Sequence, residues 1–447
     1  MRRNADDKAP LRAVALCLRW LLLATAIVAA PALAALPIQH WTSGSGVRVY
    51  FIQSRGLPML DINIDFDAGG RRAPAGKAGL AGLTHTLVKT GSAQLTEEEL
   101  SRRIADVGAE LGGRADRDRA GFSLRTLVSG REREQALATF AAMLQAPAFP
   151  EAAFLREKAR LIAALEEDAT KPDAIAERSF YQTLYGTHPY ARIPAPETVR
   201  DIARADVLNY FRTHYVAERA VLTLVGDADR ALAERIAEKL TAGLAHEHSR
   251  AEPLPPVVRA PGRQLRIAHP ATQAHILLGL PAIARGDADY FALLVGNYAL
   301  GGGGFVSRLY LEVREKRGYA YSVYSAFLPY AQEGPFQIGL QTKKERAGEA
   351  LAQVRAVLDG FLAHGPSPAE IRAAKQNLTG GYALRIDSNR KLLEQTAVIG
   401  YYRLPLTWMD DFAARIEKVT LAEVRAAFTR RISKDDLVTV IVGGGQD

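Results

Sequence analysis

The segment Ala205-Asp-Val-Leu-Asn-Tyr-Phe211 returns near the C-terminus as Ala422-Glu-Val-Arg-Ala-Ala-Phe428. Its valines, Val207 and Val424, are 217 residues apart (424 − 207 = 217). The same interval relates three further pairs: the apolar runs Ala220–Gly226 and Leu437–Gly443, the lysines Lys158 and Lys375, and the leucines Leu161 and Leu378. One interval that holds over residues 158–226 and 375–443 indicates that the chain contains two copies of one unit.

Each copy has the same coarse order of predicted elements, which is clearest in the first. Residues 60–66 alternate between apolar and polar side chains, and this pattern predicts a strand. Further along, periodicity predicts helices and a closing strand: helices over 78–89, 96–107, 131–145 and 151–169, and a strand over 220–226. We therefore expect an α+β fold of two homologous halves, in which helices cover one face of each sheet.

A polar, proline-rich segment, residues 245–256, separates the two copies and predicts a linker. The expected domains are therefore residues 35–244 and residues 257–447. The formal net charge of the whole chain is +8. Five basic and two acidic residues precede position 35, so the rest of the chain is close to +5. Its Lys and Arg residues are interspersed with Asp and Glu, which predicts no nucleic-acid partner.

Residues 1–34 have the pattern of a signal peptide. A basic stretch precedes an apolar run from Trp20 to Ala34, and the run ends in a small-x-small site before Ala35. The run is shorter than the ~20 residues that span a bilayer, so we expect cleavage and no stable membrane insertion; a retained anchor is the alternative. The only cysteine, Cys17, lies inside this segment, which excludes disulfides and thiolate metal sites from the mature chain. These features predict a periplasmic protein.

Residues 82–92 read Gly-Leu-Thr-His-Thr-Leu-Val-Lys-Thr-Gly-Ser. In the H-x-x-E-H pattern, two histidines on one helix face hold zinc, and the glutamate activates the metal-bound water. Here His85 stands at the first position, Val88 replaces the glutamate and Lys89 replaces the second histidine. Valine cannot accept a proton and an ammonium cannot ligate zinc. Taken alone, His85 is better explained as a packed histidine on an apolar helix.

A duplicated α+β half with a G-L-x-H helix near its start resembles the M16 family, the group of pitrilysin, insulin-degrading enzyme and the mitochondrial processing peptidases. The resemblance spans residues 36–447 and implies mainly antiparallel sheets. It also implies a third zinc ligand at the start of a later helix, where this chain has Glu157-Lys-Ala-Arg-Leu-Ile162, and the similar tripeptide His188-Pro-Tyr190 follows.

By this resemblance, two of the three zinc-ligand positions remain, His85 and Glu157, whereas catalytic zinc normally has three protein ligands. We expect Lys89 to occupy the place of the metal and to pair with Glu157. The prediction is therefore no metal and no cofactor in this chain. Zinc held by His85, Glu157 and a further ligand is the alternative.

The second half contains the most specific match to the family. The run Gly301-Gly-Gly-Gly304 leads into Arg314 and then Tyr321, seven residues later. The resemblance implies that these two side chains reach the substrate backbone at the scissile bond. A guanidinium and a phenol can both donate hydrogen bonds to a peptide carbonyl and its developing oxyanion. An ordinary surface pair is the alternative.

A substrate-pairing edge strand is implied near Gly113-Arg114-Ala115, where the family usually has G-x-x-N-A. An extended peptide can add to such an edge through main-chain hydrogen bonds. Arg114 stands where Asn is typical, and it can also be read as a solvated edge charge.

Some bacterial M16 members divide the work between two chains, and this sequence resembles the partner that lacks H-x-x-E-H. It predicts the non-catalytic, substrate-binding subunit of a heterodimeric periplasmic zinc metallopeptidase, with no catalytic residue of its own. Zinc would belong to an H-x-x-E-H partner, and extended peptides would be the substrates. The alternatives are a self-sufficient zinc peptidase with a degenerate site and a structural scaffold of the same fold.

Overall fold

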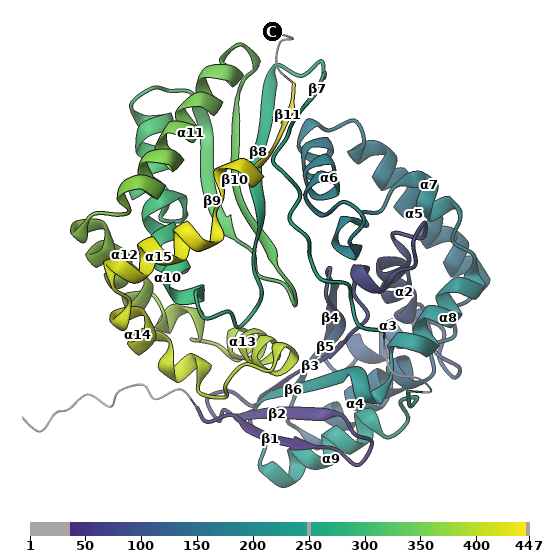
Figure 1. The fold of residues 1–447 in the computed structure, drawn as a ribbon. Helices are drawn as coiled ribbons and strands as arrows, with labels where there is room; N and C mark the ends of the chain where they lie inside the picture. Colours follow the sequence, from purple (N-terminus) through teal and green to yellow (C-terminus); the bar gives the residue numbers. More distant parts are fainter. Residues whose placement is uncertain (1–35, 248–251, 444–447) are drawn as a thin grey trace, which may run out of the picture. The chain divides into compact units, whose positions relative to one another are not determined.

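The computed structural model describes residues 36–247 and 252–443. The predicted signal peptide, with Cys17, lies outside these ranges, as do four residues of the predicted linker. Two sheets organise the described chain (Figure 1). The first has the order β1 (Gln39–Thr42), β2 (Arg48–Gln53), β6 (Ala220–Gly226), β3 (Met59–Phe66), β5 (Ala120–Leu127), β4 (Glu110–Ala115). The second has the order β7 (Gln264–Ile267), β11 (Val438–Val442), β8 (Gln273–Ile283), β10 (Gly334–Lys343), β9 (Ala320–Phe327).

Both sheets are mainly antiparallel. Within the first, β3 pairs antiparallel with β5 and β6, so that Ile62 lies between Leu124 and Leu224. The parallel pairs, β2 with β6 and β7 with β11, occupy equivalent places in the two sheets. The expected α+β fold with two sheets covered by helices is confirmed.

Helices form where the periodicity predicts them. The first half contains α2 (Leu80–Val88), α3 (Glu97–Ala105), α4 (Gly130–Gln145), α5 (Glu151–Asp168), α7 (Pro196–Arg200), α8 (Arg204–His214) and α9 (Arg230–Thr241). The second half contains α10 (Tyr290–Asn297), α11 (Ala347–His364), α12 (Pro368–Gly380), α14 (Trp408–Lys418) and α15 (Leu421–Arg431). Local chemistry sets several of the ends: a capping box between Thr96 and Glu99, for example, begins α3. None of the described helices is long and apolar enough to cross a membrane.

The two lysines that are repeated in the sequence, Lys158 and Lys375, make equivalent contacts in the two halves. The ammonium of Lys158 donates to the carbonyls of Arg200 and Ile202, at 2.6 and 2.7 Å. Lys375 donates to the carbonyl of Glu417 at 2.6 Å. The lysines and the acceptors Arg200 and Glu417 all keep the interval of 217 residues (417 − 200 = 217). Each lysine therefore ties its own helix, α5 or α12, to a carbonyl at the end of the helix beside it.

Alternation along β3 places polar side chains on the sheet face opposite the helix-covered core. Leu60, Ile62 and Ile64 are fully buried in the core, and the residues between them point the other way. These intervening residues are also buried polar groups: Asp61, Asn63 and Asp65. This buried polar face requires a cover that the helices of the same half do not supply.

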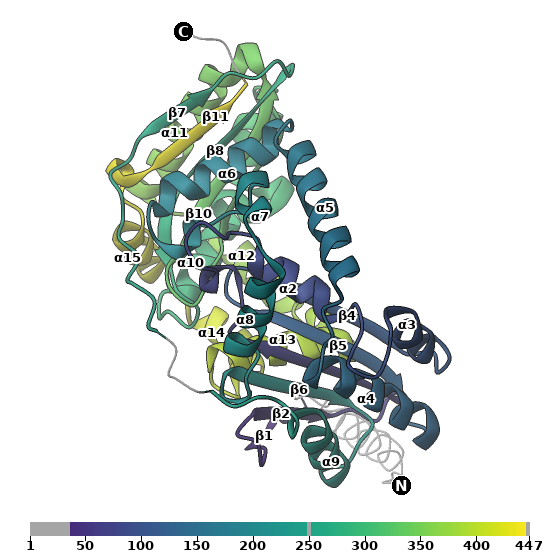
Figure 2. The same ribbon diagram turned by 90° about the vertical axis from the view of Figure 1, so that its right-hand side faces the viewer.

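The halves cover each other by exchanging one helix each. Helix α6 (Pro172–Tyr185) belongs to the first half but packs on β8 and β11 of the second sheet (Figures 1 and 2). Helix α13 (Asn389–Tyr402) packs on β2, β3 and β6 of the first. Both contacts are close, because a Cβ at Gly279 would lie 3.0 Å from the ring of Phe180, and one at Gly400 would lie 2.8 Å from the ring of Tyr50. Each helix thus crosses to the sheet encoded in the other copy.

Candidate functional site

His85 is the one histidine of the zinc pattern that this chain retains, and its side chain is packed inside the first half. Its ring is buried against Phe122, with ring centroids 4.6 Å apart. Its Nε2 lies 2.9 Å from the carbonyl oxygen of Gly121. A carbonyl can only accept, so Nε2 must carry the hydrogen and donate it. Burial lowers the pKa of His85 to about 4, and the nearby Lys89 ammonium acts in the same direction. The imidazole is therefore neutral, and its Nε2–H is used in the hydrogen bond to Gly121.

Strand β4 closes over this nitrogen. A Cβ on Gly113 would lie 2.8 Å from Nε2 of His85 and 2.6 Å from the carbonyl oxygen of Gly121. Both distances are too short for any side chain at position 113. The glycine thus lets the backbone of β4 approach the imidazole.

Two of the other three positions of the zinc pattern, Val88 and Glu157, are buried in structural contacts. Val88 is fully buried in the core of the first half, and Lys89 is half-buried at the end of α2. Glu157 is buried on α5, where Nε of Arg156 lies 2.8 Å and a terminal nitrogen of Arg160 lies 3.2 Å from its carboxylate oxygens.

The expected ion pair between Lys89 and Glu157 is wrong. The ion pairs formed by Glu157 within the described ranges are those with Arg156 and Arg160. Both partners lie on the same helix as Glu157: Arg156 is the preceding residue, and Arg160 is three positions later, a spacing at which helical side chains meet. Lys89 is left to influence His85 only through space.

The side chains present do not fit zinc. Nε2 of His85 is a donor, the carboxylate of Glu157 is shared by two guanidiniums, and no ligand replaces the lost second histidine at position 89. Over residues 36–247 and 252–443, no three His, Cys, Asp or Glu side chains gather as a metal site would require. The donor set therefore opposes the alternative of a self-sufficient zinc peptidase.

The implied substrate strand, Gly113-Arg114-Ala115, lies on β4, which forms an edge of the first sheet. Arg114 is not a freely solvated charge: its guanidinium turns inward to Asp65, at 3.5 Å. A cleft of about 450 Å³ runs between β4 and the exchanged helix α13, and both Gly113 and Arg114 line it. The edge strand β4 thus contributes residues to a cleft as well as an unpaired edge to the sheet.

The fully buried carboxylate of Asp65 explains why Arg114 turns inward. It also accepts from Arg119 at 3.1 Å and from the amide of Asn63 at 2.9 Å. An ionised carboxylate is stable in such a place only when it is paired and hydrogen-bonded. Arg114 therefore contributes to the charge balance of the polar face of the sheet.

Arg314 and Tyr321 lie together in the second half. Arg314 is on the π-helical segment η6 (Tyr310–Glu315), and Tyr321 is near the start of the edge strand β9. The guanidinium lies 5.2 Å from the centroid of the Tyr321 ring and 4.8 Å from that of Tyr310, distances typical of cation–π contacts. Tyr321 is 76% exposed. In the described part of the chain, neither side chain is engaged in a hydrogen bond or ion pair, so both retain their donors.

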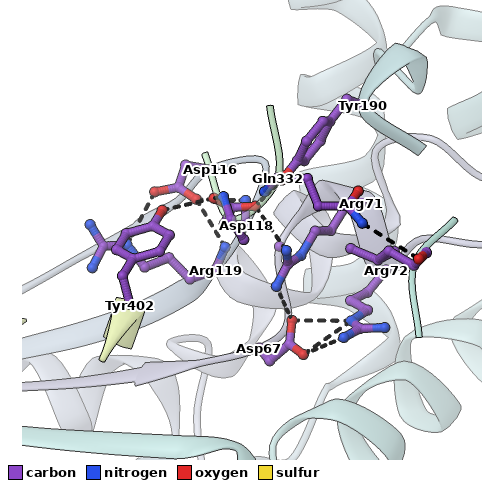
Figure 3. A network of polar contacts seen from close by, with 12 residues as sticks. Asp67, Arg71, Arg72, Asp116, Asp118, Arg119, Tyr190, Gln332 and Tyr402 are labelled. Atoms are coloured by element: carbon purple, nitrogen blue, oxygen red, sulfur yellow. Dashed lines mark hydrogen bonds and ion pairs between the residues drawn. The ribbon is translucent and has the colours of Figure 1, made fainter. Parts of the chain in front are cut away.

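The sequence did not reveal the polar network around Asp118, which joins the two halves (Figure 3). This carboxylate is 1% exposed and accepts at 2.8 Å from the hydroxyls of Tyr190 and Tyr402 and from the N–H of Ala331. It also pairs with Arg71 at 3.1 Å. Arg71 and Tyr190 belong to the first half, Ala331 and Tyr402 to the second. The tripeptide His188-Pro-Tyr190 was the one sequence feature that pointed to this network, since Tyr190 supplies one of the hydroxyls that donate to Asp118.

Comparisons with known proteins agree with this architecture. The family model described as insulinase (peptidase family M16) matches residues 48–195, and the model described as peptidase M16 inactive domain matches residues 201–378. A crystal structure of a peptidase M16 inactive domain from Pseudomonas fluorescens has a TM-score of 0.88 and 34% identity, and the match covers 92% of this chain and 98% of that one. The chain belongs to the M16 peptidase family.

M16 relatives include proteins with and without peptidase names. An uncharacterised zinc protease of Streptomyces coelicolor is 28% identical over 375 residues, which cover 80% of this chain and 79% of the relative. A non-peptidase homologue from Helicobacter pylori is 25% identical over 406 residues, which cover 89% and 91%. The expected M16 membership is thus confirmed, and the family contains both kinds of chain at similar distance from this one.

Proposed function

We propose that this M16 chain is the non-catalytic, substrate-binding subunit of a two-chain zinc peptidase. The supporting observation is a contrast between its halves. In the first half, His85 and Glu157 are committed to structural contacts. In the second half, Arg314 and Tyr321 keep unused donors, and Tyr321 is exposed. A chain that keeps such donors without a metal site has the parts for binding a substrate and lacks those for cutting it.

The residues suggest a division of labour within the pair. A peptide in extended conformation would add to the edge of β4 by main-chain hydrogen bonds, with the cleft beside α13 giving access. Arg314 and Tyr321 would donate to a peptide carbonyl whose oxygen gains charge during hydrolysis. An H-x-x-E-H partner would supply zinc and the general base. The name of the Helicobacter pylori relative, a non-peptidase homologue, supports the loss of independent activity.

We further propose that the pair works in the periplasm. This part of the proposal depends on the basic and apolar pattern of residues 1–34 and on the absence of cysteine after Cys17.

The test is reconstitution with an H-x-x-E-H M16 chain encoded beside this one. Peptide hydrolysis would be measured with a quenched fluorescent peptide for each chain alone and for the mixture. We expect no zinc-dependent hydrolysis by this chain alone and a substantial increase in rate when the two are mixed. Zinc-dependent hydrolysis by the isolated chain would overturn the proposal, as would a mixture no faster than the partner alone.

A further inference from the structure

A cavity of about 490 Å³ lies between the halves, beside the Asp118 network and apart from the β4 cleft. One wall is the turn from Asp116 to Arg119, which joins β4 to β5. The opposite wall is built by α10, the end of β8 and the turn between β9 and β10. Its volume is in the range of sites that hold small organic ligands.

The two carboxylates at the cavity are fully engaged. Asp118 serves the two tyrosines, Ala331 and Arg71. Asp116 accepts from the N–H groups of Asp118 and Arg119, at 2.8 and 2.9 Å, and from Nε of Arg119 at 3.3 Å. Arg119 in turn is paired with Asp65. These charges therefore balance one another and leave nothing to neutralise a further cation.

At this cavity, Arg285 is the cation for which the described residues supply no counterion. It lines the cavity, its Nε is buried, and that N–H has no acceptor. Among the described residues, its side chain forms no ion pair, and its contact is with the ring of Tyr402, at 5.3 Å. A buried donor with no acceptor is unfavourable and rare in folded proteins. The terminal nitrogens of Arg285 form no hydrogen bond with the described residues, so they are the donors open to an acceptor in the cavity.

Arg117 adds to this surplus of positive charge. Its guanidinium stacks 3.7 Å from the ring centroid of Tyr181, and its carboxylate partner, Glu177, is 3.9 Å away and largely exposed. Part of the lining is apolar, including Ile283, Leu294, Phe327 and Leu328. The cavity thus combines two weakly neutralised guanidiniums with an apolar wall.

We propose that this cavity binds an organic carboxylate that carries an apolar group, with Arg285 as its principal anchor and Arg117 as a second donor. Arginine suits this task because its planar fork of N–H donors matches a carboxylate. The C-terminus of a peptide that ends in an apolar residue has this chemistry, and so does a small free acid. The inference does not depend on an H-x-x-E-H partner, so it stands or fails separately from the proposed function.

The test is calorimetry on the full chain without any partner. The probes are N-acetyl-leucine, its amide, octanoate and acetate. We expect N-acetyl-leucine or octanoate to bind at least about tenfold more tightly than the amide and acetate, since both the charge and the apolar group contribute. Tighter binding of N-acetyl-leucine than of octanoate would indicate a peptide C-terminus, and the reverse order a free acid.

Variants tie the binding to the cavity. Arg285→Gln should weaken the carboxylate probes by about tenfold or more, and Arg117→Gln should weaken them less. The matched control, Arg131→Gln on the exposed surface of α4, should bind as the wild type does. Thermal unfolding checks that each variant is folded. If Arg285→Gln does not fold, the affinity of Arg117→Gln is used to test the proposal. The proposal is overturned by equal binding of acid and amide, by equal binding of acetate, by no binding to the wild type at millimolar concentration, or by unchanged affinity in the folded arginine variants.

Discussion

Nε2 of His85 donates a hydrogen bond of 2.9 Å to the carbonyl oxygen of Gly121. This bond shows most clearly that the histidine of α2 has a structural role. The histidine that would hold a metal in a peptidase instead joins α2 to β5. The bond requires a neutral ring with its hydrogen on Nε2, so its consequences can be measured by titration and by substitution.

The first prediction concerns pH. Burial lowers the folded-state pKa of His85 from 6.5 to about 4, so between these values the unfolded chain takes up a proton and the folded chain does not. Stability from this group is therefore complete above pH 6.5 and is lost as pH falls toward 4, with a total of about 3 kcal/mol. His85→Gln keeps a donor for Gly121 but does not titrate.

Urea unfolding from pH 7 to pH 4.5 checks this prediction. The variant should lose less stability on acidification than the wild type does. Some slope will remain, because burial also lowers the pKa of His214 to about 4. The exposed His364→Gln serves as control and should keep the wild-type slope. Equal slopes for His85→Gln and the wild type would mean that folding does not lower the pKa of His85.

The second prediction concerns rebuilding the metal site. Val88→Glu/Lys89→His restores the ligand types, but Arg156 and Arg160 still hold Glu157. We expect the further changes Arg156→Ala and Arg160→Ala to strengthen zinc binding at least about tenfold, since they free a carboxylate for the metal. Calorimetric titration with zinc measures the difference. The same two alanines in the wild-type background are the control, and no gain in the quadruple variant would show that His85 cannot leave Gly121.

The third prediction concerns the exposed pair in a reconstituted peptidase. Tyr321→Phe removes one hydroxyl, and Arg314→Ala removes the guanidinium. A well-aligned donor to a developing oxyanion contributes about 10²–10³ in rate, so kcat/KM should fall by at least tenfold in each variant. Tyr382→Phe, whose ring stacks on Phe412, is the matched control and should be unchanged. Size-exclusion chromatography must show that the complex is intact. Wild-type rates for both variants would favour a scaffold role.

The fourth prediction concerns the contact between the halves. Asp118→Ala leaves the hydroxyls of Tyr190 and Tyr402 buried without their acceptor. It also removes one of the two carboxylates that pair with the buried Arg71, since Asp67 remains at 2.9 Å. Breaking a buried ion pair from one side costs about 3–5 kcal/mol, and urea unfolding should show a loss of this size. Asp118→Asn keeps an acceptor and should lose less. The exposed Asp435→Ala should be neutral, and a neutral Asp118→Ala would mean that the network does not stabilise the folded state.

The sequence by itself determined the local elements, the duplication and the loss of two zinc-site residues. Helix positions follow from periodicity and from capping residues such as Thr96, which act over a few neighbours and can be read in one dimension. The interval of 217 residues was visible because Lys158 and Lys375 make equivalent contacts in both copies. Val88 and Lys89 lack the required chemistry wherever they lie.

Only the tertiary structure decided which sheet each helix covers and which partner each charge takes. Nothing local distinguishes α6 packing on its own sheet from α6 packing on the other, because the choice depends on long-range fit such as that of Phe180 over Gly279. Glu157 pairs with Arg156 and Arg160 and not with Lys89, because both arginines lie on the same helix and Arg160 is about one turn away. Asp118 became the junction of the halves because folding brought Tyr190 and Tyr402, far apart in the chain, to one buried carboxylate, where an unpaired charge would be unfavourable.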